Sequence, residues 1–351
     1  MPSKEVVTKT FQVYTGTLAE DHHHKAALFA GNSNPELARD VSKFLGMPLS
    51  DCQVGAFADG EVNIKVNETV RAKDCYIIQP VCRNGNKSVN DSLMELLLLI
   101  STMRRASAHQ IIAVIPYYGY ARQDRKMASR VPISAADVAM MITSVGADRT
   151  ICVDLHCGQI QGFFPPSVPV DNLNAGRIGA LYFAEKTDLV KPVVVSPDAG
   201  GVARAKEFRR VMEAKGITGT GLAMIIKQRA AASTIERMDL VGSVDGADCI
   251  IVDDIVDTAG TLCQAAAQLK KHGCRRVMAF ITHGLLNGPA ADRIKESVID
   301  ELVVSNTVPI PAAFEEIHNV TVLSLAPLIA ETIRRNITHE SLASVFDDGA
   351  A

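Results

Sequence analysis

The segment Cys249–Thr261, with the sequence CIIVDDIVDTAGT, carries residue types that bind phosphate and hydroxyl groups. Its apolar, β-branched run Ile250–Val252 is typical of a buried parallel strand, and Asp253 and Asp254 follow directly. The next residues, Asp257–Thr261, form a turn of small side chains that leads into an apolar-periodic helix. Backbone N–H groups in such a turn and at a helix N-terminus bind phosphate. The segment therefore predicts a phosphate site where a strand ends.

The side chains of this segment refine the prediction. Thr258 and Thr261 supply hydroxyl donors, and Gly260 lets the backbone approach a ligand closely. A carboxylate repels a phosphate dianion, so we expect Asp253 and Asp254 to hold sugar hydroxyls or a metal beside it. The alternative interpretation is an ordinary strand–turn–helix whose acids are solvated. The spacing DDxxDTxGT is more specific than a lone glycine-bearing turn, and it favours the binding site.

The rest of the chain predicts alternating strands and helices that position this site. Pro35 opens one helix, Asn90 or Asp91 caps another, and Ser134 with Asp137 resembles a capping box. This alternation is typical of two similar doubly wound α/β domains. The predicted strands are Ala27–Gly31, Val62–Val66, Cys75–Gln79, Ile111–Ile115, Thr150–Val153, Val193–Val195, Ile250–Val252 and Val277–Ile281, and the last helix is Ala326–Arg335.

The length of 351 residues allows two domains, each able to bury a full core. We expect an N-terminal extension over residues 1–25, in which His22–His24 belong to a solvated tether. The first domain is predicted over residues 26–171 and the second over residues 172–331, with the Pro-rich stretch FFPPSVPVDN at the boundary. Residues 332–351 are expected to return to the first domain.

The composition indicates an ordinary globular protein, with 47% hydrophobic and 21% charged residues. A net charge of −3 argues against a nucleic-acid partner or a membrane surface. The longest apolar run, Leu96–Ile100, is far shorter than the roughly 20 residues that span a bilayer. No secretory signal is visible at the start, and the eight scattered cysteines form no CxxC pair. We therefore expect a cytoplasmic protein with reduced thiols.

Seven segments, in order, resemble the class I phosphoribosyl-pyrophosphate synthetases, also called ribose-phosphate diphosphokinases, from about residue 27 to 346. They are FADGE (57–61), YARQDRK (120–126), SRVPISA (129–135), DLHCGQIQGFF (154–164), SPDAGG (196–201), KQR…ERM (227–238) and VDDIVDTAGT (252–261). The resemblance implies two domains of the type I phosphoribosyltransferase fold. It also implies transfer of the β,γ-diphosphoryl group of Mg·ATP to the C1 hydroxyl of ribose 5-phosphate, with release of AMP.

The resemblance implies roles for particular residues of the second half. The ribose 5-phosphate residues would be Asp253, Asp254, Asp257, Thr258, Ala259, Gly260 and Thr261. A pyrophosphate loop would comprise Asp198, Ala199, Gly200 and Gly201. His156 and Asp198 are the implied Mg²⁺ positions. A carboxylate suits this hard cation, whereas a histidine is an unusual ligand that acts through water or is merely structural.

The same resemblance implies an ATP site of Phe57, Asp59, Glu61, Arg122 and Gln123. An aromatic ring can stack on adenine while carboxylates accept from its amino group. Phe57, Asp59 and Glu61 would reach a neighbouring subunit, although Phe57 alone is as readily a turn-packing residue. The catalytic candidates Lys227 and Arg229 would lie in a flap over ATP, and the alternative for them is a solvated basic pair.

The resemblance further implies a homo-oligomer, a hexamer built from dimers, with control by phosphate and ADP at an anion site. Ser129, Arg130, Gln159 and Ser341 are the candidate residues of that site. Gly158, Met127 and Ala343 replace polar groups found in some members, so we expect this control to be weakened here. The loop Val81–Val89 looks longer than usual, and its sequence indicates no role.

Two other functions are open at this stage. A catalytically silent homologue that regulates an active synthetase would carry damage in the motifs, yet the flap lysine and arginine, His156, Asp198 and the 252–261 segment are intact. A phosphoribosyltransferase would lack the first domain and the YARQD segment. The synthetase is therefore the leading hypothesis.

Overall fold

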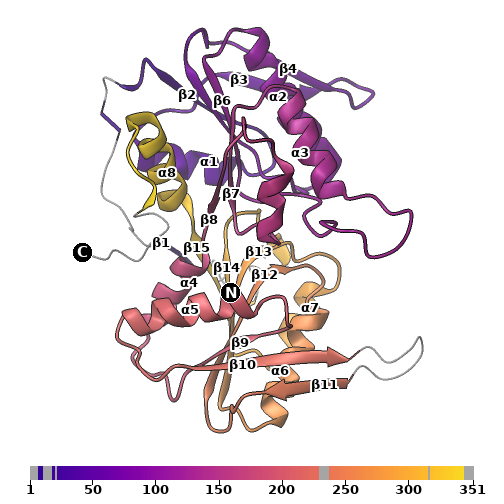
Figure 1. The fold of residues 1–351 in the computed structure, drawn as a ribbon, viewed down its shortest axis with the longest axis vertical. Helices are drawn as coiled ribbons and strands as arrows, with labels where there is room; N and C mark the ends of the chain where they lie inside the picture. The colour runs from indigo at the N-terminus through magenta and orange to yellow at the C-terminus, as the bar shows by residue number, and fades with distance from the viewer. Residues whose placement is uncertain (1–6, 11–17, 20–21, 229–236, 315–316, 344–351) are drawn as a thin grey trace, which may run out of the picture. The chain divides into compact units, whose positions relative to one another are not determined.

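The computed structural model describes residues 7–10, 18–19, 22–228, 237–314 and 317–343, and the chain divides into two compact units (Figure 1). The N-terminal unit comprises Gln12–Asn174, Thr307–Pro309 and Leu325–Ala351. The C-terminal unit comprises Met1–Phe11, Ala175–Asn306 and Ile310–Ser324. Each unit contains a predominantly parallel sheet with helices on both faces, which confirms the predicted α/β class.

The N-terminal unit is built on a five-stranded parallel sheet in the order β2-β5-β6-β7-β8. Its helices α1 and α8 pack together on one face, while α2 and α3 cover the other (Figure 1). The strands are β2 (Ala26–Ala30), β5 (Asp74–Ile78), β6 (Gln110–Ile115), β7 (Arg149–Val153) and β8 (Val170–Leu173). The helices are α1 (Pro35–Leu45), α2 (Val89–Arg105), α3 (Ser134–Ser144), the 3₁₀ turn η2 (Gly158–Phe163) and α8 (Ala326–Thr338).

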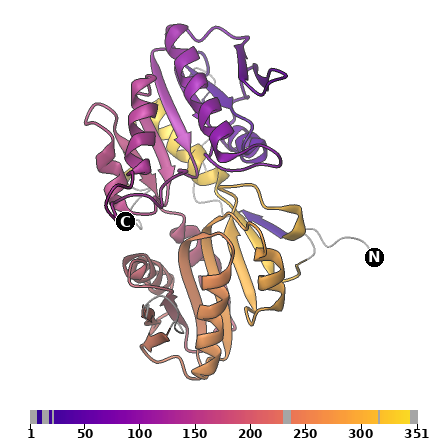
Figure 2. The same cartoon turned by 90° about the vertical axis from the view of Figure 1, so that its right-hand side faces the viewer.

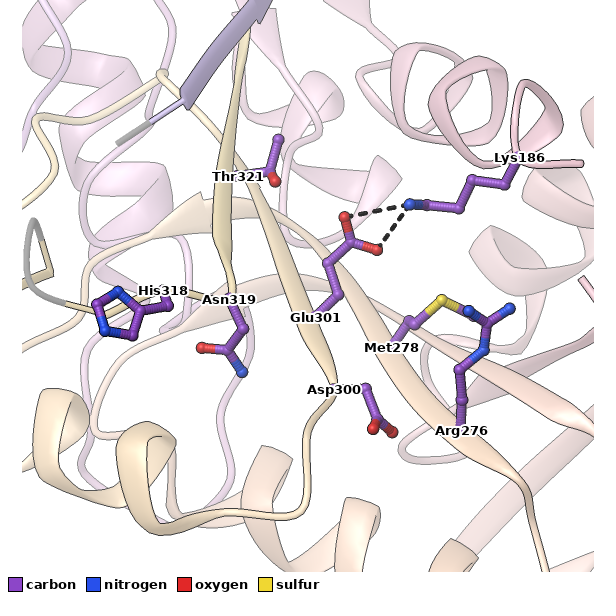
Figure 3. Close-up of a pocket in the computed structure, with 8 residues that line it drawn as sticks. All are labelled: Lys186, Arg276, Met278, Asp300, Glu301, His318, Asn319 and Thr321. Carbon is purple, nitrogen blue, oxygen red and sulfur yellow. Dashed lines mark hydrogen bonds and ion pairs between the residues drawn. The ribbon is translucent and has the colours of Figure 1, made fainter. Parts of the chain in front are cut away.

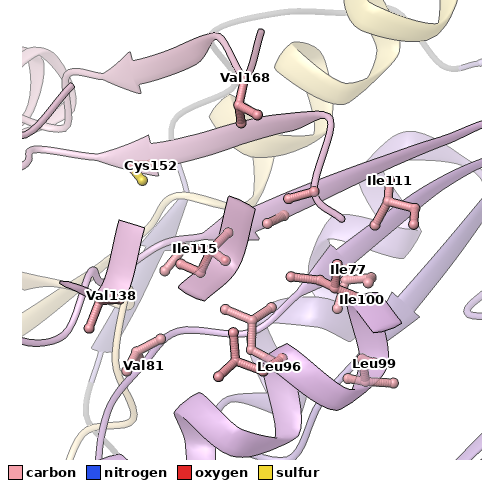
Figure 4. Packing of buried hydrophobic residues seen from close by; sticks show 14 of the residues in the cluster. Ile77, Val81, Leu96, Leu99, Ile100, Ile111, Ile115, Val138, Cys152 and Val168 are labelled. Atoms are coloured by element: carbon pink, nitrogen blue, oxygen red, sulfur yellow. The ribbon is translucent and has the colours of Figure 1, made fainter. Parts of the chain in front are cut away.

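Alternate residues of these strands enter the core beneath α2 and α3. Ile77, Ile111, Ile115 and Cys152 pack there against Leu96 and its neighbours on α2 (Figure 4). The intervening strand residues are also buried, because α1 and α8 cover the opposite face. Burial on both faces explains why these strands read as continuous apolar runs in the sequence.

A separate two-stranded antiparallel hairpin belongs to the same unit, formed by β3 (Cys52–Ala56) and β4 (Val62–Val66). The side chains of Val54 and Ile64 alternate with exposed residues and pack against the unit's core. An isolated two-stranded hairpin is marginally stable in water, so this packing is needed to hold it.

The C-terminal unit is built on an eight-stranded sheet in the order β1-β15-β14-β13-β12-β9-β10-β11. All neighbouring strands are parallel except β10 and β11. The strands are β1 (Val7–Thr10), β9 (Val193–Ser196), β10 (Gly221–Gln228), β11 (Arg237–Val241), β12 (Asp248–Val256), β13 (Arg276–Gly284), β14 (Glu301–Ser305) and β15 (Val320–Ser324).

Helices cover both faces of this sheet as well. α4 (Gly176–Ala184) and α5 (Val202–Ala214) pack together, while α6 (Gly260–Lys271) lies beside α7 (Ala290–Glu296), followed later by the 3₁₀ turn η3 (Ala312–Phe314). Figure 2 views this unit from the side that α6 covers. Gly179 allows α4 to approach the sheet closely, because a Cβ there would lie 2.5 Å from the Phe280 ring.

Several local predictions differ from the structure. Ser88, not Asn90 or Asp91, caps α2, and its hydroxyl and Asp91 form a reciprocal capping box. Ser134 is the first residue of α3 and caps nothing, because its hydroxyl donates to Gln123 instead. Within residues 1–25, which we expected to form an extension, strand β1 pairs in parallel with β15 at the edge of the sheet of the C-terminal unit.

Candidate active site

The predicted phosphate segment lies at a topological switch point of the C-terminal sheet. From β9 the chain proceeds to β10 and β11 on one side, and then to β12 and β13 on the other side of β9. In open α/β sheets, ligands bind beyond the carboxyl ends of the strands that flank such a point. Asp198 follows β9, and Asp253 and Asp254 lie near the end of β12. The fold thus brings together two segments whose sequences we predicted to bind phosphate groups.

The turn after β12 adopts the geometry that an anion site requires. Ala259 is buried in a left-handed conformation with φ 59°, and α6 begins at the next residue. A left-handed residue followed by helical residues turns successive N–H groups toward one concave side, and the helix N-terminus adds its partial positive charge. Thr258 and Thr261 are exposed at this turn, where their hydroxyls can reach a ligand.

Neighbouring residues hold this turn in place. Asn287 donates from Nδ2 to Asp257 Oδ1 over 2.9 Å and from its backbone N–H to the Asp257 carbonyl over 2.9 Å. Arg293 Nη1 donates to the Thr258 carbonyl oxygen over 2.9 Å. A Cβ at Gly260 would lie 3.1 Å from the same Arg293 nitrogen, so a glycine suits this position. The turn is therefore fixed before any ligand arrives.

Asp253 and Asp254 lie within β12, which continues to Val256 beyond the predicted strand end. Arg204, on the first turn of α5, lies 3.3 Å from Asp253 Oδ1 and 3.2 Å from Asp254 Oδ1. Burial raises the pKa of Asp253 above its usual range, the charge of Asp254 raises it further, and Arg204 opposes the rise. The result is a closely spaced carboxylate pair held by one cation.

The Asp198 loop is folded around its own carboxylate. Gly201 N–H donates to Asp198 Oδ1 over 2.9 Å, and Ser196 Oγ donates to the Asp198 carbonyl over 2.7 Å. A Cβ at Gly201 would lie 2.8 Å from Ser196 Oγ, so only glycine fits there without rearrangement. Asp198 is itself exposed, as are Ala199 and Gly200. An exposed carboxylate beside open backbone suits a cation that also binds ligand phosphates.

Asp198 can bind Mg²⁺ as a single protein carboxylate, with water and substrate phosphates as the other ligands. Among the described residues, no three His, Cys, Asp or Glu side chains form a metal-binding group. Mg²⁺ commonly takes one or two protein carboxylates and completes its shell with water and substrate phosphates. The exposed Asp198 is a carboxylate of that kind, and it lies beside the predicted phosphate turn in the same unit.

The backbone of Lys227, one of the two catalytic candidates, lies at the end of β10. Because β10 pairs in parallel with β9, its carboxyl end lies at the same edge of the sheet as the switch point. The backbone of Lys227 belongs to β10 and pairs with Met238 on β11. Arg229 lies outside the described residues, as does the side chain of Lys227.

The predicted nucleotide residues belong to the N-terminal unit. Phe57, Asp59 and Glu61 occupy the turn between β3 and β4, where Glu61 N–H donates to Asp59 Oδ1 over 3.1 Å and all three residues are exposed. Phe57 exposes 56% of its surface, so it does not pack within its own turn. That exposure disfavours the turn-packing interpretation of this aromatic residue.

Arg122 and Gln123 follow β6 and are exposed. The Gln123 carbonyl accepts from Ala135 N–H over 3.1 Å, and its side chain accepts from Ser134 Oγ. These contacts hold the loop against the start of α3. The structure therefore gives Gln123 a defined conformation at the carboxyl end of β6.

The remaining candidates are also exposed residues of the N-terminal unit. His156 follows β7, and the preceding Asp154 adopts a left-handed backbone with φ 38°. Arg130 likewise has φ 60°. The predicted anion-site residues Ser129, Arg130, Gln159 and Ser341 are described and exposed. His156 and Asp198, the two implied Mg²⁺ positions, fall in different units.

Sequence reasoning missed three residues that support the candidate site at the switch point (the switch-point site), namely Arg204, Asn287 and Arg293. Each acts on a partner at least 30 positions away in the chain: Arg204 on Asp253, Asn287 on Asp257, and Arg293 on Thr258. Arg204 could have been noticed in the sequence, because it is a basic residue three positions after the SPDAGG segment. Nothing in the sequence marked Asn287 or Arg293.

A pocket of the C-terminal unit lies near the amino-terminal ends of β13 and β14, away from the carboxyl strand ends at the switch point (Figure 3). Lys186 and Glu301 pair there over 3.0 Å, and Arg276 pairs with Asp188 over 2.7 Å. Both cations of the pocket are therefore paired with carboxylates, which disfavours the binding of a phosphate there. The lining residues are Lys186, Arg276, Met278, Asp300, Glu301, His318, Asn319 and Thr321.

Two family models match parts of this chain. Residues 26–146 match the family model described as the N-terminal domain of ribose phosphate pyrophosphokinase, and residues 223–347 match the phosphoribosyl synthetase-associated domain. Within the described residues, no helix has the length and apolar character needed to cross a bilayer.

Individual relatives match over nearly their full length. The ribose-phosphate pyrophosphokinase of Helicobacter pylori is 49% identical over 91% of this chain and 95% of its own length. That of Clostridium perfringens is 46% identical over 94% of this chain and 100% of its own. The phosphoribosylpyrophosphate synthetase of Mycobacterium smegmatis superposes with a TM-score of 0.81 at 39% identity, covering 90% of this chain and 99% of that one. The chain therefore belongs to the ribose-phosphate pyrophosphokinase family.

Proposed function

We propose that the switch-point site holds ribose 5-phosphate, the acceptor in the reaction of this ribose-phosphate pyrophosphokinase. The enzyme transfers the diphosphoryl group of Mg·ATP to C1 of ribose 5-phosphate, giving phosphoribosyl pyrophosphate and AMP for nucleotide biosynthesis. One observation carries the assignment: the left-handed turn at Ala259 and the N-terminus of α6 lie directly after the carboxylate pair Asp253–Asp254. The turn can bind a phosphate group and the adjacent carboxylates can bind hydroxyl groups, and a phosphorylated sugar carries both.

In this proposal, the residues Asp257–Thr261 bind the 5-phosphate through backbone N–H groups and the two threonine hydroxyls. Asp253 and Asp254 accept hydrogen bonds from ribose hydroxyls, and Arg204 keeps the pair together when the sugar is absent. Holding the sugar at its phosphate and at its hydroxyls fixes the position of the C1 hydroxyl that attacks ATP. Such positioning can supply a large part of the rate enhancement in phosphoryl transfer.

The nucleotide is assigned to the exposed side chains Phe57, Asp59, Glu61, Arg122 and Gln123. An exposed ring can stack on adenine, and an exposed carboxylate can accept from its amino group. Lys227 and Arg229, at and just beyond the end of β10, would neutralise charge on the transferring group.

Mg²⁺ would be held by Asp198 and by His156, the latter through water, with Ala199, Gly200 and Gly201 beside the pyrophosphate. When bound, the ion would neutralise the negative charge that develops on the phosphate oxygens during transfer. Asp198 contributes a carboxylate, and the open backbone at Gly200 and Gly201 lets amides approach the phosphates.

We propose a homo-oligomer, a hexamer built from dimers, because the turn that carries Phe57, Asp59 and Glu61 is exposed throughout and suits a site completed by a neighbouring subunit. We also propose a cytoplasmic location, which fits eight cysteines that are all free thiols. Control by phosphate and ADP at Ser129, Arg130, Gln159 and Ser341 is proposed to be weak, because Met127, Gly158 and Ala343 provide no hydroxyl. Strong phosphate activation with ordinary ADP inhibition would contradict this last point.

A single assay tests the proposed function. Purified protein is incubated with Mg·ATP and ribose 5-phosphate, and AMP release is followed. AMP formation that requires ribose 5-phosphate supports the synthetase. No AMP formation, combined with stimulation of an active synthetase on mixing, would indicate the catalytically silent homologue instead.

A further inference from the structure

Glu95 of α2 is a buried carboxylate in the N-terminal unit, with a side chain only 1% exposed. Four donors surround it. Asn32 reaches it from the backbone N–H over 3.2 Å and from Nδ2 over 3.0 Å, and Gln79 Nε2 reaches it over 2.9 Å. The fourth donor is the ammonium group of Lys87. An unpaired buried charge destabilises the folded state, and the positive charge of Lys87 offsets the desolvation of the Glu95 carboxylate.

Lys87 belongs to the loop between β5 and α2, whose role the sequence did not indicate. The backbones of Asn84 and Lys87 pair with each other, with N–O distances of 3.2 Å and 3.0 Å, and this closes a tight turn. From the same turn, Asn84 Nδ2 donates to the Asn32 carbonyl over 3.0 Å. The loop therefore holds Asn32 directly through Asn84 and indirectly through Lys87 and Glu95.

Asn32 connects this cluster to the hairpin β3–β4. Its Nδ2 group donates one hydrogen bond to Glu95 and another, of 2.9 Å, to the carbonyl oxygen of Val54 on β3. Both amide hydrogens are then used, so the orientation of the Asn32 side chain is fixed by Glu95 at one end and the hairpin at the other. Val54 precedes Phe57 by only three residues.

We infer that Lys87 is a positioning residue for the nucleotide site: through Glu95 and Asn32 it fixes strand β3 and the turn Phe57–Glu61 that follows. The hairpin forms its own two-stranded sheet, so its placement depends on side-chain packing and on such anchoring hydrogen bonds. This inference rests on the proposed function, because it matters only if Phe57, Asp59 and Glu61 bind ATP.

The decisive experiment compares Michaelis constants for the two substrates. In Lys87→Met, Glu95 loses its cation, so the carboxylate that orients the Asn32 side chain is itself held less firmly, and with it the hydrogen bond from Asn32 to Val54. We expect the KM for ATP to rise about tenfold, as for loss of a charge-assisted hydrogen bond, while the KM for ribose 5-phosphate stays within about twofold. Lys87→Arg retains the cation and should restore most of the ATP affinity.

A matched control and a second variant complete the design. Lys43→Met removes a lysine whose side chain is 76% exposed and pairs with Asp40 on the surface of α1, and it should change neither KM. Asn32→Ala keeps the Lys87–Glu95 pair and removes the bond to Val54. It remains informative if Lys87→Met does not fold, and it should also raise the KM for ATP alone.

The outcomes separate a positioning role from a structural one. If Lys87→Met and Asn32→Ala lower only kcat, through a smaller active fraction, and leave both KM values unchanged, the inference is overturned. A parallel measurement on Phe57→Ala isolates the proposed function. If Phe57→Ala leaves the KM for ATP unchanged, the turn does not bind the nucleotide and the proposed function of the turn is wrong. If Phe57→Ala raises the KM for ATP but Lys87→Met and Asn32→Ala do not, only the positioning role is refuted.

Discussion

Arg293 Nη1 donates a 2.9 Å hydrogen bond to the carbonyl oxygen of Thr258, inside the turn assigned to the 5-phosphate. A cation that donates a hydrogen bond to a carbonyl oxygen of an anion-binding turn has two effects. It fixes the turn's backbone, and it adds positive charge close to the ligand.

Arg293→Met should therefore weaken binding of ribose 5-phosphate. A hydrogen bond from a charged donor contributes about 1.5–3 kcal/mol, so we expect the KM for ribose 5-phosphate to rise at least about tenfold with little change in the KM for ATP. Lys295→Met is the matched control, because Lys295 is an exposed cation of the same helix. Equal effects of the two substitutions would show that only general charge matters.

The Asp253–Asp254 pair predicts an unusual pH dependence. Burial and the neighbouring carboxylate raise the pKa of Asp253, so this residue takes up a proton at a higher pH than an ordinary aspartate as the pH falls. Arg204→Met removes the cation that opposes this rise. Its acid limb in kcat/KM for ribose 5-phosphate should therefore lie at higher pH than that of the wild type. The substrate phosphate also titrates near pH 6, but it does so equally in both proteins. Coincident acid limbs would contradict the assignment.

Lys227 is predicted to act mainly in the transition state. Lys227→Ala should lower kcat at least ~100-fold with a modest change in the KM for ATP, because a donor aimed at developing charge contributes little to ground-state binding. Steady-state kinetics with AMP detection measures both constants. Near wild-type turnover would refute the flap assignment.

The exposed turn at Phe57 predicts that active sites are shared between subunits. Phe57→Ala should raise the KM for ATP about tenfold through lost base stacking. Co-assembly of Phe57→Ala with Lys227→Ala subunits should then produce sites that contain both native residues. At low ATP, the mixture should exceed the summed activity of the separate variants. No gain would mean that both residues serve a site within one subunit.

Much of the fold followed from the sequence because buried parallel strands are continuous β-branched runs, as Ile111–Ile115 and Val277–Ile281 illustrate. The strand ends were less predictable. β12 continues through the two acids to Val256, since pairing with β13 extends a strand beyond its apolar run. β1 was missed because its four residues, VTKT, are mostly polar and show no apolar run.

The candidate ligand-binding residues of the switch-point site could be named from the sequence, but the residues that hold them in place could not. Asp253 and Thr258 lie in one contiguous motif, whereas Arg204 and Arg293 reach it from separate helices. Likewise, the position of the switch point depends on strand order, which is set by long-range pairing and leaves no local trace in the sequence. Local chemistry can be recognised from spacing alone, but the residues that hold it in place require the fold.

The most direct test is a crystal structure of the enzyme soaked with ribose 5-phosphate and a non-hydrolysable Mg·ATP analogue. We expect the 5-phosphate on the N–H groups of Asp257–Thr261 and the ribose hydroxyls on Asp253 and Asp254. An empty turn in crystals that bind the nucleotide, with the sugar phosphate held elsewhere, would contradict it.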